Sequence, residues 1–214
     1  MDYRRTNPSQ RYRDLIGQYR AMHDEGERFL GIAPEQTFAG TSLLPHLQDI
    51  KRLIRQVGAG SILDYGCGKG TQYLPRIIDR DGERWDSVQD YWDVDYVHCY
   101  DPCYQPFSEL PMGKHDGVIS TDVLEHCPED DVPWILDEMF GYARKFVFIT
   151  VACYPARKHL PSGENAHCTI KPLKWWGVLL GEVSTRYPGI TWEAKVYHVE
   201  PAGSEMVEQI LRGG

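Results

Sequence analysis

The chain has 214 residues, of which 42% are hydrophobic, so it is long enough to bury one sizeable core and is not disordered throughout. A formal net charge of −8 disfavours stable nucleic-acid binding, because proteins that grip a phosphate backbone usually carry a basic surface. The polar start of the chain does not resemble a secretory signal, and no apolar run approaches the roughly 18 residues of a membrane-spanning helix. We therefore expect a cytoplasmic protein without membrane or stable nucleic-acid partners.

Residues 1–58 are expected to form an N-terminal helical cap segment. Apolar residues recur at helical spacing over residues 11–23 and again over residues 43–57. A stretch of turn-forming residues over 31–40 predicts a loop between these two helices.

Strands and helices alternate from residue 59 onward, which predicts a mostly parallel sheet with helices on both faces. The predicted strands cover residues 61–65, 96–100, 117–120 and 145–152. The predicted helices cover residues 71–78, 130–142 and 172–180, and residues 79–95 are interpreted as an inserted loop. Residues 190–199 and 206–211 are expected to form a final antiparallel hairpin.

The cysteines do not follow a recognisable ligand or disulfide pattern. Six occur at irregular spacing without a C-x-x-C pair, at Cys67, Cys99, Cys103, Cys127, Cys153 and Cys168. This spacing predicts neither a disulfide framework nor a zinc site. We expect six reduced thiols and no bound metal.

A glycine-rich turn, Asp64-Tyr65-Gly66-Cys67-Gly68-Lys69-Gly70, ends the first predicted strand and opens the following helix. Glycines let the backbone turn sharply and let a ligand approach closely, and the helix start would offer free N–H groups. A second acidic residue, Asp101, ends the next strand, where a carboxylate can accept both hydroxyls of a ribose.

Two details separate this loop from a dinucleotide site. The third glycine of G-x-G-x-x-G would fall on Thr71. Asp64 lies two positions before the first glycine, where its charge would repel a pyrophosphate but suits the ammonium of a methionine group. Both details disfavour a nicotinamide-dependent oxidoreductase.

The ordered set of Asp64-x-Gly-x-Gly-x-Gly, Asp101-Pro102 and Asp122-Val-Leu-Glu-His resembles the class I S-adenosylmethionine-dependent methyltransferases of the small-molecule type. The resemblance covers roughly residues 60–212. It implies an α/β, Rossmann-like domain over residues 59–214, with the helical cap closing over the cofactor. It also implies S-adenosylmethionine as cofactor, bound by Asp64, Gly66, Gly68, Gly70, Asp101 and Asp122.

The chain departs from this family in two places. The connection from Gly70 to Asp101 is longer than usual, and that from Asp101 to Asp116 is shorter. A third strand must therefore be brief, near residues 104–110. The acidic residue that commonly binds the adenine amine in the family cannot be assigned.

The resemblance implies methyl transfer to the oxygen or nitrogen of a small-molecule acceptor. His126 follows the fourth strand of the family pattern, and His167 lies in the loop after the fifth, so either could take a proton from a hydroxyl. The alternative interpretation is a packing or helix-capping role for His126 and an ordinary solvent-exposed loop position for His167. Tyr154, Arg157, Lys158 and His159 in the same loop could meet an acidic or polyhydroxylated acceptor. The alternative is a non-catalytic S-adenosylmethionine-binding or interaction protein, because a fold alone does not establish catalysis.

Overall fold

The sheet runs through the middle of the molecule. The computed structural model describes residues 3–79, 81–199 and 206–214, and in these residues six strands pair in the order β4-β1-β5-β6-β7-β8. The strands are β1 (Ser61–Tyr65), β4 (Tyr96–Tyr100), β5 (His115–Thr121), β6 (Ala143–Ala152), β7 (Thr191–Val199) and β8 (Met206–Gly213). All neighbouring pairs are parallel except β7 with β8, which is antiparallel. The expected α/β class with a mostly parallel sheet is confirmed, and the final two strands pair as expected.

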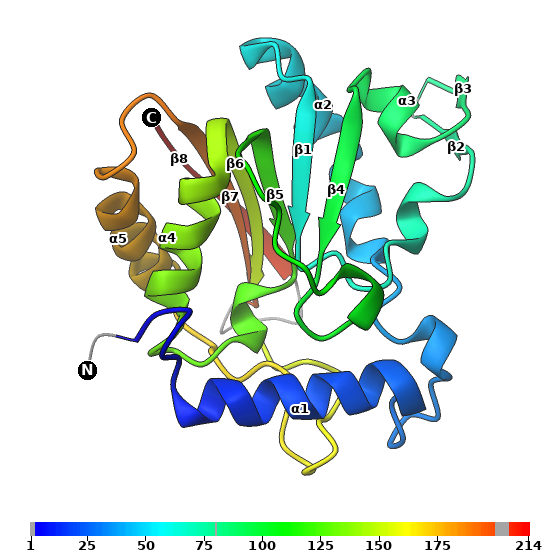
Figure 1. Ribbon diagram of the computed structural model, residues 1–214, viewed down its shortest axis with the longest axis vertical. Coiled ribbons are helices and arrows are strands. Elements are labelled where there is room, and N and C mark those ends of the chain that lie inside the picture. The colour runs from blue at the N-terminus through cyan, green and yellow to red at the C-terminus, as the bar shows by residue number, and fades with distance from the viewer. Residues whose placement is uncertain (1–2, 80, 200–205) are drawn as a thin grey trace.

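Helices cover both faces of the sheet (Figure 1). On one face lie α4 (Val132–Tyr142) and α5 (Leu173–Ser184), and on the other lie α2 (Leu47–Val57) and α3 (Val88–Trp92). Among the described residues, no helix combines the length and the apolar character needed to cross a membrane.

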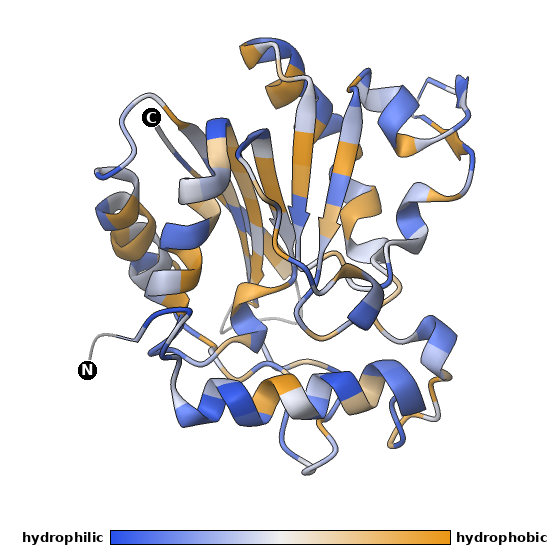
Figure 2. Cartoon of the chain, in the orientation of Figure 1, coloured by the Kyte–Doolittle hydropathy of each residue, from blue (hydrophilic) through white to orange (hydrophobic). Residues whose placement is uncertain are grey.

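Alternate residues of the strands supply the two halves of the core, because successive side chains of a strand point to opposite faces. Leu63, Val118, Val147 and Ile149 pack with α4 and α5. Ile62, Ile119, Phe146 and Phe148 pack with α2 and α3. The central strands are accordingly apolar along most of their length (Figure 2), as expected for strands buried on both faces.

The predicted helix over residues 71–78 is wrong. A short 3₁₀ helix over Thr71–Tyr73 follows the glycine loop, and β2 (Ile77–Ile78) then pairs with β3 (Arg84–Trp85). Pro75 explains the difference, because proline lacks the N–H donor and disfavours helical backbone at the preceding residue. The expected long helix, with free N–H groups at its start, is therefore replaced by a single turn.

Two further expectations near β4 are corrected. The segment over residues 79–95 is not a plain loop, because it contains β3 and α3, and α3 buries Val88, Tyr91 and Trp92 against the sheet. No strand forms over residues 104–110, which are all described; a 3₁₀ helix over Gln105–Phe107 occupies this place. Pro106 begins this turn region and cannot donate to a strand ladder, so β4 stays at the edge of the sheet.

The helix α1 (Gln10–Glu25) lies across the carboxyl-terminal edge of the parallel strands (Figure 1). Ser9 begins it, with its hydroxyl accepting a hydrogen bond of 3.0 Å from the Tyr12 N–H. Its buried residues Leu15, Tyr19 and Met22 pack against the loop that follows β6. Within the expected cap over residues 1–58, α1 covers this edge, whereas α2 packs on a face of the sheet.

Arg5 ties the start of the chain to the sheet. Its guanidinium donates to both carboxylate oxygens of Glu138 and to the hydroxyls of Tyr65, at 2.8 Å, and Tyr100, at 3.0 Å. The same group lies 5.3 Å from the centroid of the Trp134 ring. These contacts fix the segment that leads into α1.

We expect the substitution Arg5→Met to lower the free energy of unfolding by about 2 kcal/mol. The substitution removes the charge-assisted hydrogen bonds from Arg5, so that the Glu138 carboxylate keeps only the hydrogen bond from the Tyr65 hydroxyl. Urea denaturation measures this change, and hydrogen exchange should show faster opening of α1. Arg13→Met, at an exposed position of α1, is the matched control. Unchanged exchange in α1 after Arg5→Met would contradict the anchoring role.

Candidate functional site

A cavity of about 540 Å³ lies between α1 and the carboxyl-terminal edge of the sheet. The loops that follow β1, β4, β5 and β6 line it, because parallel neighbouring strands end at the same edge. His159 is outside the lining, but nine of the residues expected from the sequence line this cavity, namely Gly66, Gly68, Asp101, Asp122, His126, Tyr154, Arg157, Lys158 and His167. Its volume is within the usual range for small-molecule sites.

The glycine loop adopts backbone angles that favour glycine. Gly66, Gly68 and Gly70 have φ values of +85°, +60° and +66°. A Cβ on Gly66 would lie 2.4 Å from Cγ2 of Val123, and one on Gly68 would lie 2.2 Å from the Phe38 carbonyl oxygen. These glycines therefore allow other segments of the chain to approach, and Gly66 and Gly68 also leave backbone facing the cavity.

The segment before α2 closes over this loop. The Lys69 N–H donates to the Phe38 carbonyl at 2.8 Å, and the Thr71 hydroxyl donates to the Ala39 carbonyl at 2.6 Å. Ser42, from the same segment, also lines the cavity, and its hydroxyl lies 3.3 Å from the hydroxyl of Thr121 at the end of β5. The cap and the glycine loop thus form one continuous wall.

Asp101 is held rigidly in the cavity wall. One carboxylate oxygen accepts from the Gly68 N–H at 3.0 Å, and the other accepts from the Cys103 N–H at 2.8 Å. Burial raises the pKa of Asp101 to about 6, although these N–H groups oppose the shift. The Tyr104 N–H also acts on this carboxylate, and each carboxylate oxygen has two acceptor positions, so part of the acceptor capacity remains for a ligand.

Asp64 does not line the cavity. Its carboxylate is buried beneath the glycine loop, where it accepts from the Tyr73 hydroxyl at 2.8 Å and from the Gln72 amide at 3.1 Å. Burial raises its pKa to about 7, and these two hydrogen bonds oppose the shift. Asp64 and Gly70, which also lies outside the cavity lining, shape the loop, and their direct contact with a cofactor stays a prediction.

Asp122 lies at the end of β5 with a φ of +56°. Its N–H donates to the Thr150 hydroxyl at 3.0 Å, which fixes the turn. Asp122 is exposed and lines the cavity. Burial within the cavity raises the pKa of this carboxyl, and the charges of His167 and Lys158 oppose the shift.

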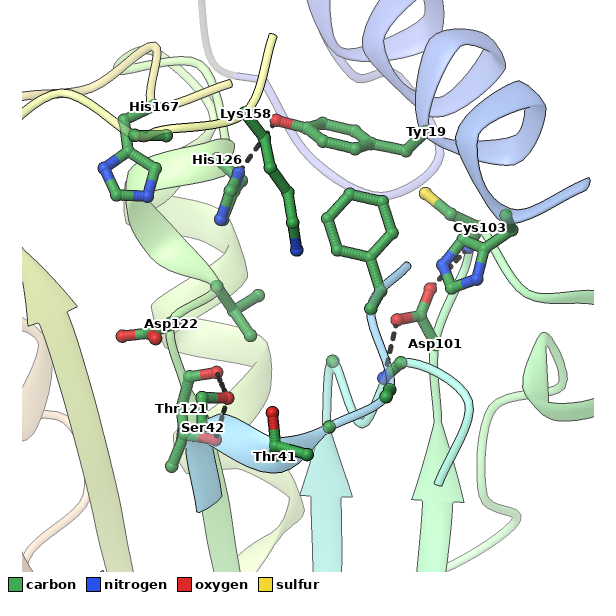
Figure 3. A pocket seen from close by; sticks show the side chains of 18 of the residues that line it. Tyr19, Thr41, Ser42, Asp101, Cys103, Thr121, Asp122, His126, Lys158 and His167 are labelled. Carbon is green, nitrogen blue, oxygen red and sulfur yellow. Dashed lines mark hydrogen bonds between the residues drawn. The ribbon is translucent and has the colours of Figure 1, made fainter. Parts of the chain in front are cut away.

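The two expected histidines meet in the cavity, with their ring centroids 4.7 Å apart in an edge-to-face arrangement. Figure 3 shows His126, His167 and Lys158 on the same side as Asp122, and Asp101 on the opposite side. The segments after β5 and β6 therefore converge, as the sequence pattern predicted.

Backbone carbonyls determine the tautomer of both rings, because a carbonyl oxygen only accepts. Nδ1 of His167 lies 2.6 Å from the Tyr154 carbonyl, so Nδ1 carries the proton. Nδ1 of His126 lies 3.0 Å from the Ala166 carbonyl and 2.9 Å from the Tyr19 hydroxyl, which itself donates to Ala166. In each ring Nε2 is therefore left as an acceptor.

The two imidazoles differ in basicity. Burial, together with the nearby charges of His167 and Lys158, lowers the pKa of His126 to about 3, although the hydrogen bond to Ala166 opposes the shift. Burial also lowers the pKa of His167, but its hydrogen bond to Tyr154 and the carboxylate of Asp122 oppose the shift. His167 is thus the stronger base of the pair.

Residues of α1 complete the cavity and were not assigned to it from the sequence. Tyr19 reaches His126, and His23 is stacked on Tyr104 with a centroid distance of 5.1 Å. Burial, followed by the charge of Lys69, lowers the pKa of His23 to about 4. The helical spacing of residues 11–23 indicated a buried face but not the partner that this face meets.

All six cysteines lie in the described ranges and are free thiols. Within those ranges, no group of three or more His, Cys, Asp or Glu side chains is arranged to hold a metal ion. No family model, curated protein sequence or solved structure matches the chain.

We expect Gly68→Ala to destabilise the protein by at least about 1 kcal/mol more than Gly58→Ala, because an added Cβ at Gly68 meets the Phe38 carbonyl. Gly58 has a similar φ of +61° with open space around it, so its substitution measures backbone strain alone, about 1–2 kcal/mol. Chemical denaturation of both variants gives the comparison. Equal losses would show that the Phe38 segment does not pack tightly on the loop.

Proposed function

We propose that this protein binds S-adenosylmethionine and transfers its methyl group to an oxygen or nitrogen of a small molecule. The observation that carries the proposal is the position of Asp101. Its fixed carboxylate, next to the cavity-lining backbone of Gly66 and Gly68, keeps part of its acceptor capacity for a ligand. A carboxylate in this position suits the hydroxyls of a ribose.

The carboxylates of the cavity support a cationic group near the glycine loop. Asp101 adjoins that loop and Asp122 lines the same cavity, where their charges would attract a sulfonium or an ammonium group, whereas the cations Lys158 and Arg157 line the part formed by the loop after β6. The glycine loop leads into a three-residue 3₁₀ turn, so it lacks the helix start that commonly binds phosphates. Both features support S-adenosylmethionine over a nicotinamide cofactor.

S-Adenosylmethionine would supply a methyl group on a positively charged sulfur, which keeps the bonding electrons and becomes a neutral thioether as the acceptor takes the methyl group. His167 accepts the proton of an acceptor hydroxyl at Nε2, while the Tyr154 carbonyl holds the ring through Nδ1. His126 accepts a second hydrogen bond at Nε2 and orients the acceptor. The helix α1 covers the reacting groups and excludes water.

Asp101→Ala should weaken binding of S-adenosylhomocysteine, the demethylated cofactor, at least tenfold, because charge-assisted hydrogen bonds contribute about 1.5–3 kcal/mol each. Isothermal titration calorimetry measures the affinity. Asp130→Ala, which removes an exposed carboxylate outside the cavity, is the control. Equal affinities for the two variants would contradict the assignment of Asp101 to the ribose.

His167→Ala should lower transfer of label from S-adenosylmethionine into a small-metabolite extract by roughly 10²–10⁴, with unchanged affinity for S-adenosylhomocysteine. His159→Ala is the matched control, because His159 lies in the same loop but not in the cavity lining. Tight cofactor binding without any transfer by the unmodified protein would instead support a non-catalytic binding protein.

The pH dependence of this transfer should carry the signature of a lowered histidine pKa. Because the pKa of His167 lies below its ordinary value of 6.5, the neutral base persists at more acidic pH than a free histidine allows. We expect the acid limb of kcat/KM below pH 6.5. An acid limb at or above that value would exclude His167, in the environment seen here, as the base.

A further inference from the structure

The acceptor side of the cavity contains a lysine whose ammonium has no hydrogen-bond or ion-pair partner among the described residues. The Lys158 side chain extends into the cavity beside His126 (Figure 3), and Nζ lies 4.7 Å from the centroid of the Phe38 ring. Its ammonium makes no hydrogen bond or ion pair with any residue in the part of the chain that the structure describes. Lysines that leave bulk water are normally paired, because an unpaired buried charge is costly.

The nearest carboxylates do not satisfy this ammonium. Glu27 is buried and already accepts from the N–H groups of Phe29, at 3.2 Å, and Leu30, at 2.7 Å. Asp122 acts on Lys158 electrostatically, without an ion pair. Lys158 therefore presents its donors to whatever enters the cavity.

The groups around Lys158 are acceptors. Nε2 of His126 and of His167, together with the carboxylate of Asp122, can each accept a hydrogen bond from a hydroxyl. Lys158 beside three acceptors matches a ligand that has an anionic group and neighbouring hydroxyls, and the exposed Arg157 adds a second cation to the lining. The negative charge of Asp122 favours a singly charged carboxylate over a phosphate dianion.

We propose that the methyl acceptor is a small hydroxylated carboxylic acid, whose carboxylate pairs with Lys158 while its hydroxyl donates to Nε2 of His167. The inference rests on the proposed function, because it assigns the acceptor of the same site. The charge of Lys158 lowers the pKa of His167. A bound carboxylate would offset this charge and raise the pKa, so the acceptor itself would make His167 a stronger base.

The test uses the full chain saturated with S-adenosylhomocysteine and two matched probes, glycolate and its neutral amide. NMR of the histidine rings and calorimetry give the affinities. We expect glycolate to bind at least tenfold more tightly than glycolamide to the unmodified protein and to Lys158→Arg. Lys158→Met should lose this preference, whereas Lys174→Met, at an exposed position of α5, should keep it.

The outcomes separate this inference from the proposed function. Failure of the unmodified protein to bind S-adenosylhomocysteine would contradict the proposed function. A tenfold loss of S-adenosylhomocysteine affinity in Lys158→Met would assign the lysine to the cofactor carboxylate and overturn the inference alone. Equal binding of the two probes, no binding of glycolate, or tighter binding of inorganic phosphate than of glycolate would also overturn it.

Discussion

Parallel hydrogen bonding between β4, β1, β5 and β6 forces the four loops that follow these strands to leave the sheet at one edge. Residues separated by up to about a hundred positions in the chain thereby line one cavity. The buried apolar strands keep their register, because a shift by one residue would exchange the two faces of the core. The position of each polar group in the cavity depends on that register.

The helix α1 turns this open edge into a covered site. Arg5 and Ser9 fasten its start through Glu138 and Asp131, respectively, and Leu15 and Met22 pack against the loop beneath it. By excluding water, the helix raises the pKa of carboxyl groups in the wall and lowers that of the imidazoles. The same cover therefore fixes the geometry and sets the protonation states on which the proposed chemistry depends.

The cavity is divided by charge. Asp101 stands on one side, fixed by two backbone N–H groups, and suits hydroxyls. Lys158, His126 and His167 lie on the other side with Asp122 (Figure 3), where the lysine ammonium adjoins several hydrogen-bond acceptors. Such a division would favour a different chemical group on each side of the cavity.

The sequence by itself determined the α/β class, the strands around the glycine loop, and the convergence of Asp101, Asp122, His126 and His167, because these follow from hydrophobic periodicity and from where parallel strands end. Pro75 was a local signal against the expected helix at residues 71–78, but the spacing of the apolar residues in this segment outweighed it in the prediction. Other features depended on packing between distant segments. Asp64 lies near the end of β1 and Asp101 directly follows β4, yet only the tertiary structure buried the first beneath the loop and left the second facing the cavity. Likewise, the sequence contained Lys158 and Tyr19 without indicating their surroundings. Contacts between residues far apart in the chain placed Lys158 in the cavity without an ion pair and placed α1, with Tyr19, over it.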